Sequence, residues 1–191
     1  MATTTDYLYR SSSTVPDGDV TIYKNEVKNP YGELQGPTEV PDILDSGERV
    51  EFKSGAVRDI HKGKGRCDLM PIGVVANLLG DRYLLKIDEF LTKRDSIDIL
   101  YDCLYTFFKE TYGDLYSGIL EVSKHYEGGA IKYGEHNWEK GIPLHSFFDS
   151  AIRHRIKMLR CDTDEPHDRA FAWNIMGAIW TLENKPEYID I

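Results

Sequence analysis

The sequence predicts a mostly α-helical protein, a helical bundle with an irregular N-terminal arm. From Pro71 onward, apolar residues recur at the three- and four-residue spacing of a helix that buries one face. Residues 1–47 are polar, contain four of the eight prolines and show no helical period. We therefore expect an arm or irregular wrap over residues 1–47 and a helical domain over residues 48–191.

Within the arm, a short strand is expected at residues 20–23, because β-branched and aromatic residues favour extended structure. Six helices are expected after the arm. Pro71 suits the first turn of the first helix. The last helix is expected to begin with Thr163 or Asp164 as its N-cap and with Pro166 in its first turn. In chain order the expected helices cover residues 71–79, 83–91, 95–110, 115–133, 144–160 and 164–183.

The apolar faces of these helices predict how they pack. The third helix has the clearest stripe, on which Leu100 and Phe107 share a face. On the fourth and fifth helices, Ile119 and Leu159 are among the residues expected to point inward. The last helix is nearly all apolar after Phe171, so we expect it to be central.

The composition indicates a globular protein in a reducing compartment. Apolar residues make up 41% of the chain and aromatic residues 12%, which argues against global disorder. The net charge of −9 is unsuited to general nucleic-acid binding, because the nucleic-acid backbone attracts positive charge. The three cysteines lack the spacing of a disulfide framework or a zinc ribbon and are expected to be free thiols. Since the start resembles no signal peptide and no apolar run reaches membrane-span length, we expect a cytoplasmic protein without a membrane partner.

Residues 54–66 form a local basic segment in this acidic chain. Its cations are Arg58, Lys62, Lys64 and Arg66. Two glycines among them let the backbone approach a ligand, and the combination suits phosphate binding by a loop. The segment is not a P-loop, because the GxxxxGK[ST] spacing is absent. A solvated basic loop is the alternative interpretation.

Five of the six histidines lie between residues 125 and 167, with carboxylates beside them on segments expected to be helical. Helix bundles bind divalent metals through carboxylates and histidines that project inward. Mg²⁺ prefers oxygen ligands, which Glu127 with Asp164 or Glu165 would supply. Mn²⁺ also accepts imidazole, so adding His154 and His167 would favour it. The sequence therefore predicts a Mg²⁺ or Mn²⁺ site drawn from three helices.

Each of these residues also has a purely structural interpretation. Arg153 is four residues from Asp149 and can simply bridge to it. Glu127 can pair with a neighbouring lysine, and Asn174 can be a core residue with a satisfied amide. The sequence leaves these alternatives open, and the concentration of such residues in one stretch is what favours a functional site.

Several motifs within residues 50–183 are long and specific. They are SGAVRD (54–59), GKGR (63–66) with DL (68–69), YExGAxKYG (126–134), NWxKG (137–141), SAxRH (150–154), DExH (164–167) and WN (173–174). On these residues the chain resembles the N-terminal domain of a phage-encoded dATP/dGTP diphosphohydrolase family. That family is similar to the all-α nucleoside triphosphate pyrophosphohydrolases of the MazG type.

The resemblance implies hydrolysis of dATP or dGTP to the monophosphate and pyrophosphate, with Mg²⁺ or Mn²⁺ as cofactor. Such hydrolysis needs a metal, cations for the leaving pyrophosphate and a pocket for the base. We assign catalysis to Glu127, His154 and Glu165, and metal binding to these three with Asp164 and His167. The expected phosphate-binding residues are Arg58, Lys62, Lys64, Arg66, Lys132 and Arg153, and the expected base-pocket residues are Tyr133, Asn137, Trp138 and Asn174. On this assignment, Glu127→Gln abolishes turnover and leaves the fold intact.

The chain departs from the MazG-type pattern, because the usual Glu-x-x-Glu and Glu-x-x-Asp pairs are not clear and residues 165–168 match the second only loosely. MazG-like enzymes assemble into dimers or tetramers, so the resemblance implies a homo-oligomer, in the host cytoplasm if the chain is phage-encoded. Two other functions stay open. One is a nucleotide-binding protein without turnover, and the other is a phage structural or host-interaction protein whose arm over residues 1–47 docks a partner.

Overall fold

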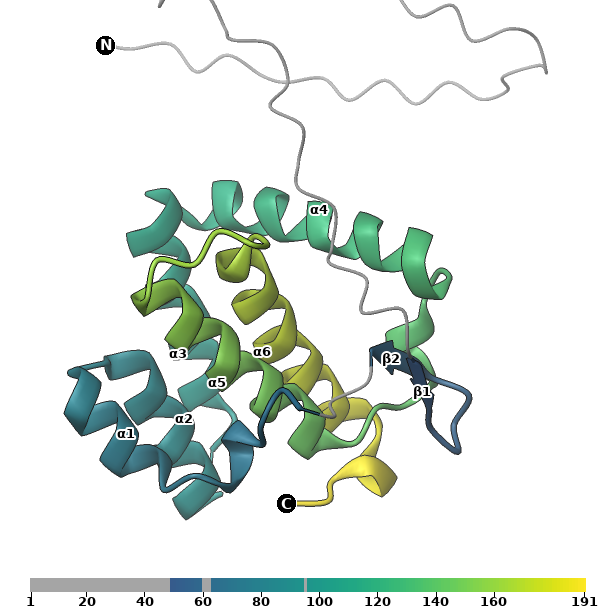
Figure 1. Cartoon of the computed structure of the whole chain (residues 1–191), viewed down its shortest axis with the longest axis horizontal. Helices are drawn as coiled ribbons and strands as arrows, with labels where there is room; N and C mark the ends of the chain where they lie inside the picture. Colours follow the sequence, from purple (N-terminus) through teal and green to yellow (C-terminus); the bar gives the residue numbers. More distant parts are fainter. Residues whose placement is uncertain (1–48, 60–62, 95) are drawn as a thin grey trace, which may run out of the picture. The chain divides into compact units, whose positions relative to one another are not determined.

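The computed structural model describes residues 49–59, 63–94 and 96–191. Within them the chain is mostly helical, with six α-helices and a two-stranded sheet, which confirms the predicted fold class (Figure 1). The predicted arm and its strand at residues 20–23 lie outside the described residues. The elements are β1 (Arg49–Glu51), β2 (Val57–Asp59), α1 (Ile72–Leu79), α2 (Arg82–Lys93), α3 (Asp98–Tyr112), α4 (Leu115–Tyr133), α5 (Leu144–Leu159) and α6 (His167–Asn184), with short 3₁₀ turns η1 (Cys67–Leu69), η2 (Asn137–Lys140) and η3 (Pro186–Tyr188).

Helix α6 is the centre of the helical domain. It packs against α3, α4 and α5, while α1 and α2 lie against each other and α2 also contacts α3 (Figure 1). Phe171, Ile175 and Ala178 on α6 are fully buried. A helix that is apolar around most of its circumference is stable only when other elements surround it. The predicted central position of this helix is therefore confirmed.

An aromatic cluster joins α2, α3 and α6. The ring centroid of Phe107 lies 4.7 Å from that of Phe171 and 5.4 Å from that of Tyr83. The Tyr83 contact is edge-on, a geometry that aromatic pairs prefer. Leu100 and Phe107 are both fully buried, as the apolar stripe of this helix predicted.

Two residues that were predicted to point inward are exposed. Ile119 on α4 is 47% exposed and Leu159, the last residue of α5, is 41% exposed. The buried residues of α4 are Gly118 and Val122, and a side chain at position 118 would collide with the Phe108 ring of α3. Because adjacent residues on a helix lie about 100° apart, the close approach at Gly118 turns Ile119 towards solvent.

The start of α6 also differs from the prediction. Neither Thr163 nor Asp164 caps it, because Pro166 occupies the N-cap position and His167 begins the helix. The Asp164 carboxylate instead accepts hydrogen bonds from His167 Nε2 at 2.8 Å and from Lys157 Nζ at 2.7 Å. The Asp164 carboxylate, which was expected to accept hydrogen bonds from backbone N–H groups as an N-cap, thus accepts them from two side chains.

A short β-hairpin stands where the sequence suggested only a loop. Strands β1 and β2 are antiparallel, with Arg49 opposite Asp59. Gly55 in the turn has a φ of +79°, a conformation that favours glycine. Each strand has only three residues, which is too short for an alternating pattern to reveal it.

The structure also bears on two predictions from composition. The three cysteines are free thiols, as expected. Cys67 is partly buried, Cys103 is buried and Cys161 is exposed. Among the described helices, none combines the length and the apolar character needed to cross a membrane.

Close packing of α5 on α6 requires glycine at position 177. A methyl group there would sit 2.3 Å from Phe147 Cε1. We expect Gly177→Ala to lower the free energy of unfolding by about 1–3 kcal/mol, because overpacking forces the ring or the backbone to move. The matched control is Gly129→Ala on α4, where a methyl group meets nothing within 4 Å and alanine favours the helix by about 0.5–1 kcal/mol. Urea denaturation measures both changes, and a Gly177→Ala protein as stable as the wild type would contradict this packing.

Candidate functional site

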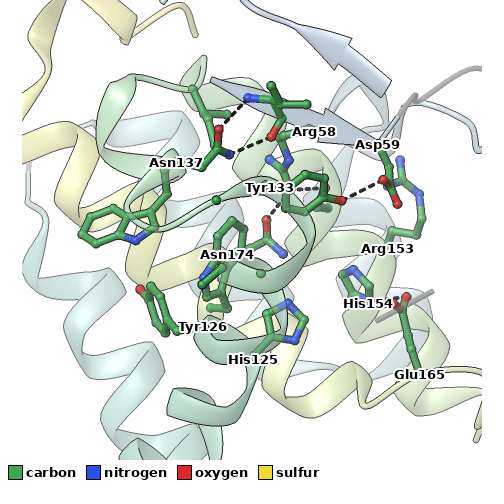
Figure 2. Close-up of a pocket in the computed structure, with 18 of the residues that line it drawn as sticks. Arg58, Asp59, His125, Tyr126, Tyr133, Asn137, Arg153, His154, Glu165 and Asn174 are labelled. Atoms are coloured by element: carbon green, nitrogen blue, oxygen red, sulfur yellow. Dashed lines mark hydrogen bonds and ion pairs between the residues drawn. The ribbon is translucent and has the colours of Figure 1, made fainter. Parts of the chain in front are cut away.

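A cavity of about 700 Å³ opens among β2, the second half of α4, α5 and the first turns of α6 (Figure 2). The loop around η2 and the segment just before α6 complete its wall. Binding pockets for small molecules have volumes of roughly 300–1,000 Å³. Both aromatic rings and charged side chains line this cavity, so a ligand with an apolar ring and a charged group would suit it.

Arg58 on β2 is a cation enclosed in the wall of this cavity. Its Nη2 donates to Asn174 Oδ1 at 2.9 Å and to Ser150 Oγ at 3.1 Å. Its guanidinium lies over the rings of Phe147 and Trp173, 5.3 and 5.6 Å from their centroids. Burial lowers the pKa of Arg58 to about 10, which still leaves it protonated at neutral pH.

The second terminal nitrogen of Arg58 lacks a partner. Nη1 is enclosed and has no hydrogen-bond partner among the described residues, and Arg58 forms no ion pair with a described carboxylate. An enclosed cationic donor without a partner costs free energy. An anionic ligand in the cavity would remove that cost.

Arg153 on α5 has a similar arrangement. Its Nη2 donates to Asp149 Oδ2 at 2.5 Å and to the carbonyl oxygen of Gly65 at 3.0 Å, so the predicted bridge to Asp149 is present. Asp149 is fully buried and also accepts a hydrogen bond from the Cys67 backbone N–H at 2.6 Å. The Nε of Arg153 is enclosed and lacks a partner within the described part of the chain.

Lys64 also lines the cavity, and burial lowers its pKa while Asp59 opposes that change.

Several residues predicted for the base pocket use their polar atoms to hold the wall together. The Asn137 amide accepts from the Val57 N–H at 2.9 Å and donates to the Val57 carbonyl at 2.8 Å (Figure 2). Asn174 accepts from Arg58 and donates to the Ala170 carbonyl. These amides therefore position β2 and Arg58.

Asp59 plays a comparable part at the end of β2. Its carboxylate accepts hydrogen bonds from Lys132 Nζ and from Tyr133 Oη, both at 2.7 Å. Tyr133 lines the cavity, whereas Lys132 does not. Both residues thereby fasten the C-terminal end of α4 to β2.

Three of the predicted metal ligands meet beside the cavity. His154 Nδ1 lies 3.1 Å from His167 Nδ1 and 3.4 Å from Glu165 Oε1, and the third side of the triangle is 3.5 Å. Ligand atoms bound at about 2.0–2.2 Å to one cation stand at separations of this size. The donor set of two imidazoles and one carboxylate is a known facial arrangement for divalent transition metals. The geometry and the chemistry of His154, Glu165 and His167 therefore fit a divalent cation.

The surroundings of this group prepare it for a cation. The pKa of His154 lies well below its ordinary value, first because it is buried and then because His167 lies beside it, so the ring is neutral. Burial raises the pKa of Glu165. Asp164 accepts a hydrogen bond from His167 Nε2, and this leaves His167 Nδ1 directed at the group. Carboxylates commonly orient metal-binding histidines in this way. A hydrogen bond from Lys157 lowers the pKa of Asp164 to about 2, so this carboxylate stays ionised.

Besides Lys132, two predicted site residues of the described part of the chain, Glu127 and Arg66, lie away from the cavity wall and from the metal-type group. Glu127 is exposed on α4 and belongs neither to the cavity wall nor to the clustered metal-type groups of the described residues. Arg66 is exposed and hydrogen-bonds to Asp68 instead. Lys62 lies outside the described residues. The structure therefore keeps Glu127 of α4 apart from the metal-type group, whose residues come from α5, the start of α6 and the segment just before it.

The structure also reveals a cavity residue that the site prediction omitted. His125 on α4 lines the cavity, packs 5.7 Å from the Trp173 ring and has an enclosed Nδ1 without a partner among the described residues. Burial lowers its pKa to about 4. Its spacing to Gly129, four residues later, was the available signal, because a glycine on the same helical face leaves open space beside the ring.

The fold and the site define a helical protein whose cavity suits a phosphorylated ligand next to a divalent cation. Residues 114–191 match the family model described as dATP/dGTP diphosphohydrolase, N-terminal, which confirms the family resemblance over these residues. Neither the curated proteins nor the solved structures give a match. The matched stretch contains the whole metal-type group and Arg153, whereas Arg58 and Lys64 precede it.

The buried, neutral state of His125 has a consequence for stability. Above pH 6.5 neither the folded nor the unfolded chain carries a proton on this ring, and as the pH falls the unfolded chain takes up a proton that the folded chain refuses until about pH 4. We expect this residue to lower the free energy of unfolding by about 2–3 kcal/mol between pH 7 and pH 4.5. Urea denaturation at both pH values should show a smaller loss for His125→Phe than for the wild type or for His145→Phe, a control outside the cavity wall. Equal losses in all three proteins would show that His125 is not held neutral.

Proposed function

We propose that the protein hydrolyses purine deoxynucleoside triphosphates, dATP and dGTP, to the monophosphate and pyrophosphate. The observation that carries the proposal is the juxtaposition of enclosed guanidinium nitrogens without described partners in the cavity wall with a metal-type triangle of side chains beside it. A nucleoside triphosphate is a ligand that needs both features at once. The family match over residues 114–191 supports the reaction class.

The cation is expected to be Mn²⁺ in preference to Mg²⁺. Mg²⁺ binds oxygen ligands and retains several waters, whereas Mn²⁺ accepts imidazole. His154 and His167 supply two of the three ligand atoms in the group, and Glu165 supplies the third. When bound there, a divalent cation provides Lewis-acid neutralisation of phosphate charge.

The chain's own residues bind and orient the triphosphate. Arg58 Nη1 and Arg153 Nε are donors without partners among the described residues, and Lys64 adds a third positive charge. Hydrogen bonds from cations to phosphate oxygens are short and about twice as strong as neutral ones. In the reaction, the bond from the α-phosphorus to the bridging oxygen breaks, a water oxygen takes its place, and pyrophosphate leaves. Cations fixed in advance around the leaving group favour that step.

Asp149 and Asn174 act indirectly. Asp149 fixes the direction of Arg153, and Asn174 fixes that of Arg58. Both of these partner residues are themselves buried, which restricts the directions that the two arginines can take. The cationic wall is thus preorganised, which is the condition for electrostatic stabilisation of a transition state.

The first test is hydrolysis itself. Purified protein is incubated with each of the four deoxynucleoside triphosphates and Mn²⁺ or Mg²⁺, and the products are separated. We expect monophosphate and pyrophosphate from dATP and dGTP. A protein that binds these nucleotides without releasing product would be a non-catalytic binding protein, and phosphate as the only inorganic product would place the cleavage at another bond.

Glutamate substitutions test the cation site. We expect Glu165→Gln to lower Mn²⁺ affinity and pyrophosphate release by at least about 100-fold, because it removes one ligand of the triangle. Glu127→Gln is the matched control and should keep both, since Glu127 is exposed and outside the group. Electron paramagnetic resonance of free Mn²⁺ measures binding independently of turnover. Loss of activity in Glu127→Gln with full activity in Glu165→Gln would reverse this assignment.

Arginine substitutions test the anion site. We expect Arg58→Gln to raise the Kd for inorganic tripolyphosphate by about 10–100-fold, because a hydrogen bond to a charged group contributes about 1.5–3 kcal/mol. Arg66→Gln is the control, since its side chain is exposed and does not line the cavity. Calorimetric titration measures both affinities, and the melting temperature shows whether each variant is folded. Unchanged affinity in a folded Arg58→Gln protein would contradict the proposed phosphate contact.

The homo-oligomer implied by the family resemblance stays a prediction.

A further inference from the structure

We propose that His125 is the residue that selects the nucleobase, an inference that rests on the proposed nucleotide function. In this arrangement the base lies against an aromatic wall formed by Tyr126, Trp138 and Trp173, and its polar edge hydrogen-bonds to His125 Nδ1. All four side chains line the cavity. The sequence prediction had placed base recognition on other residues of the same cavity.

The aromatic wall is one connected surface. The Tyr126 ring lies 5.8 Å from that of Trp138 and 6.0 Å from that of Trp173, and His125 packs 5.7 Å from Trp173. Figure 2 shows His125 and Tyr126 on α4, with His154 and Glu165 on the side of His125 away from Tyr126. Bases stack on aromatic side chains with about 1–3 kcal/mol each, whatever the base. The wall therefore explains affinity for a base, and selection among bases needs a hydrogen-bonding group beside it.

His125 offers that group because its Nδ1 is enclosed and has no partner among the described residues. A neutral imidazole carries one N–H donor and one nitrogen acceptor. Burial and the positive charge of Arg169 keep the pKa of His125 near 4, so the ring is neutral at pH 7. A neutral ring next to aromatic side chains suits the uncharged edge of a base, whereas Arg58 and Arg153 suit phosphates.

The two amides that the sequence predicted for the base pocket are already engaged. Both polar atoms of the Asn137 amide bind Val57, and those of Asn174 bind Arg58 and Ala170. Among the described residues that line the cavity next to the aromatic wall, His125 combines a neutral ring with an unmet hydrogen bond. A site that leaves a buried polar group unpaired with the wrong ligand rejects that ligand strongly.

Equilibrium binding of nucleoside monophosphates tests the inference without turnover. The four deoxynucleoside monophosphates and inorganic tripolyphosphate are titrated calorimetrically into the wild type, His125→Phe and His145→Phe. We expect the wild type to bind its preferred monophosphates about 10-fold or more tighter than the others, in line with one hydrogen bond. In His125→Phe the spread should fall below about 3-fold, with tripolyphosphate affinity unchanged. His145→Phe, which keeps the cavity wall intact, should behave as the wild type.

A second variant separates hydrogen bonding from shape. His125→Gln keeps a donor and an acceptor, so it should retain a base preference that His125→Phe has lost. Equal wild-type affinity for all four monophosphates, or an unchanged spread in a folded His125→Phe protein, would overturn the inference. If His125→Phe does not fold, His125→Leu replaces it, because leucine also lacks a hydrogen-bonding group, and an unchanged spread in a folded His125→Leu protein would overturn the inference as well.

The outcomes also separate this inference from the proposed function. Base-dependent binding that is lost in His125→Phe, in a protein whose wild type hydrolyses no deoxynucleoside triphosphate, would refute the hydrolase and leave the role of His125 supported. Wild-type hydrolysis with the same base preference in His125→Phe would refute the role of His125 and leave the hydrolase supported.

Discussion

The site depends on one enclosed cation, Arg58, which ties a three-residue strand to two helices. Through Nη2 it binds Ser150 of α5 and Asn174 of α6, and its guanidinium covers the rings of Phe147 and Trp173. Removing a guanidinium from water without a carboxylate partner costs free energy, and these contacts offset only part of that cost. The cost that is not offset comes from Nη1, which has no hydrogen-bond partner among the described residues. Burial of this guanidinium therefore costs free energy and at the same time favours an anionic ligand.

The metal-type group depends on how α5 meets the start of α6. Gly177 allows α5 and α6 to pack closely, and the two imidazoles of His154 and His167 come within 3.1 Å of each other. Two charged imidazoles would repel at that distance, and burial together with this proximity keeps His154 neutral. Asp164 fixes the other face of His167. The imidazole of His154 is thus neutral, as a cation ligand must be, and His167 Nδ1 is directed at the group.

The cavity divides its polar atoms by charge. Arg58 and Arg153 contribute enclosed charged donors, and His125 contributes an enclosed ring nitrogen that is neutral. The charged donors suit phosphate oxygens, since ionised partners make the stronger hydrogen bonds. The neutral ring lies with Tyr126 and Trp173, where a planar base would stack. One ligand that presents both an aromatic ring and a chain of negative charges satisfies the whole wall.

The helices and most of the site residues could be predicted from the sequence, because apolar periodicity and the spacing of polar groups are local properties of the chain. That is how His154, Glu165 and His167 were grouped and how the Arg153–Asp149 bridge was anticipated. Only the tertiary structure decided which way each helix is turned. The packing of Gly118 on Phe108 sets the rotation of α4, and the same helix presents His125 to the cavity while Glu127, about 200° further round, is exposed. Periodicity places side chains relative to their own helix axis, and contacts between distant segments fix that axis in the protein.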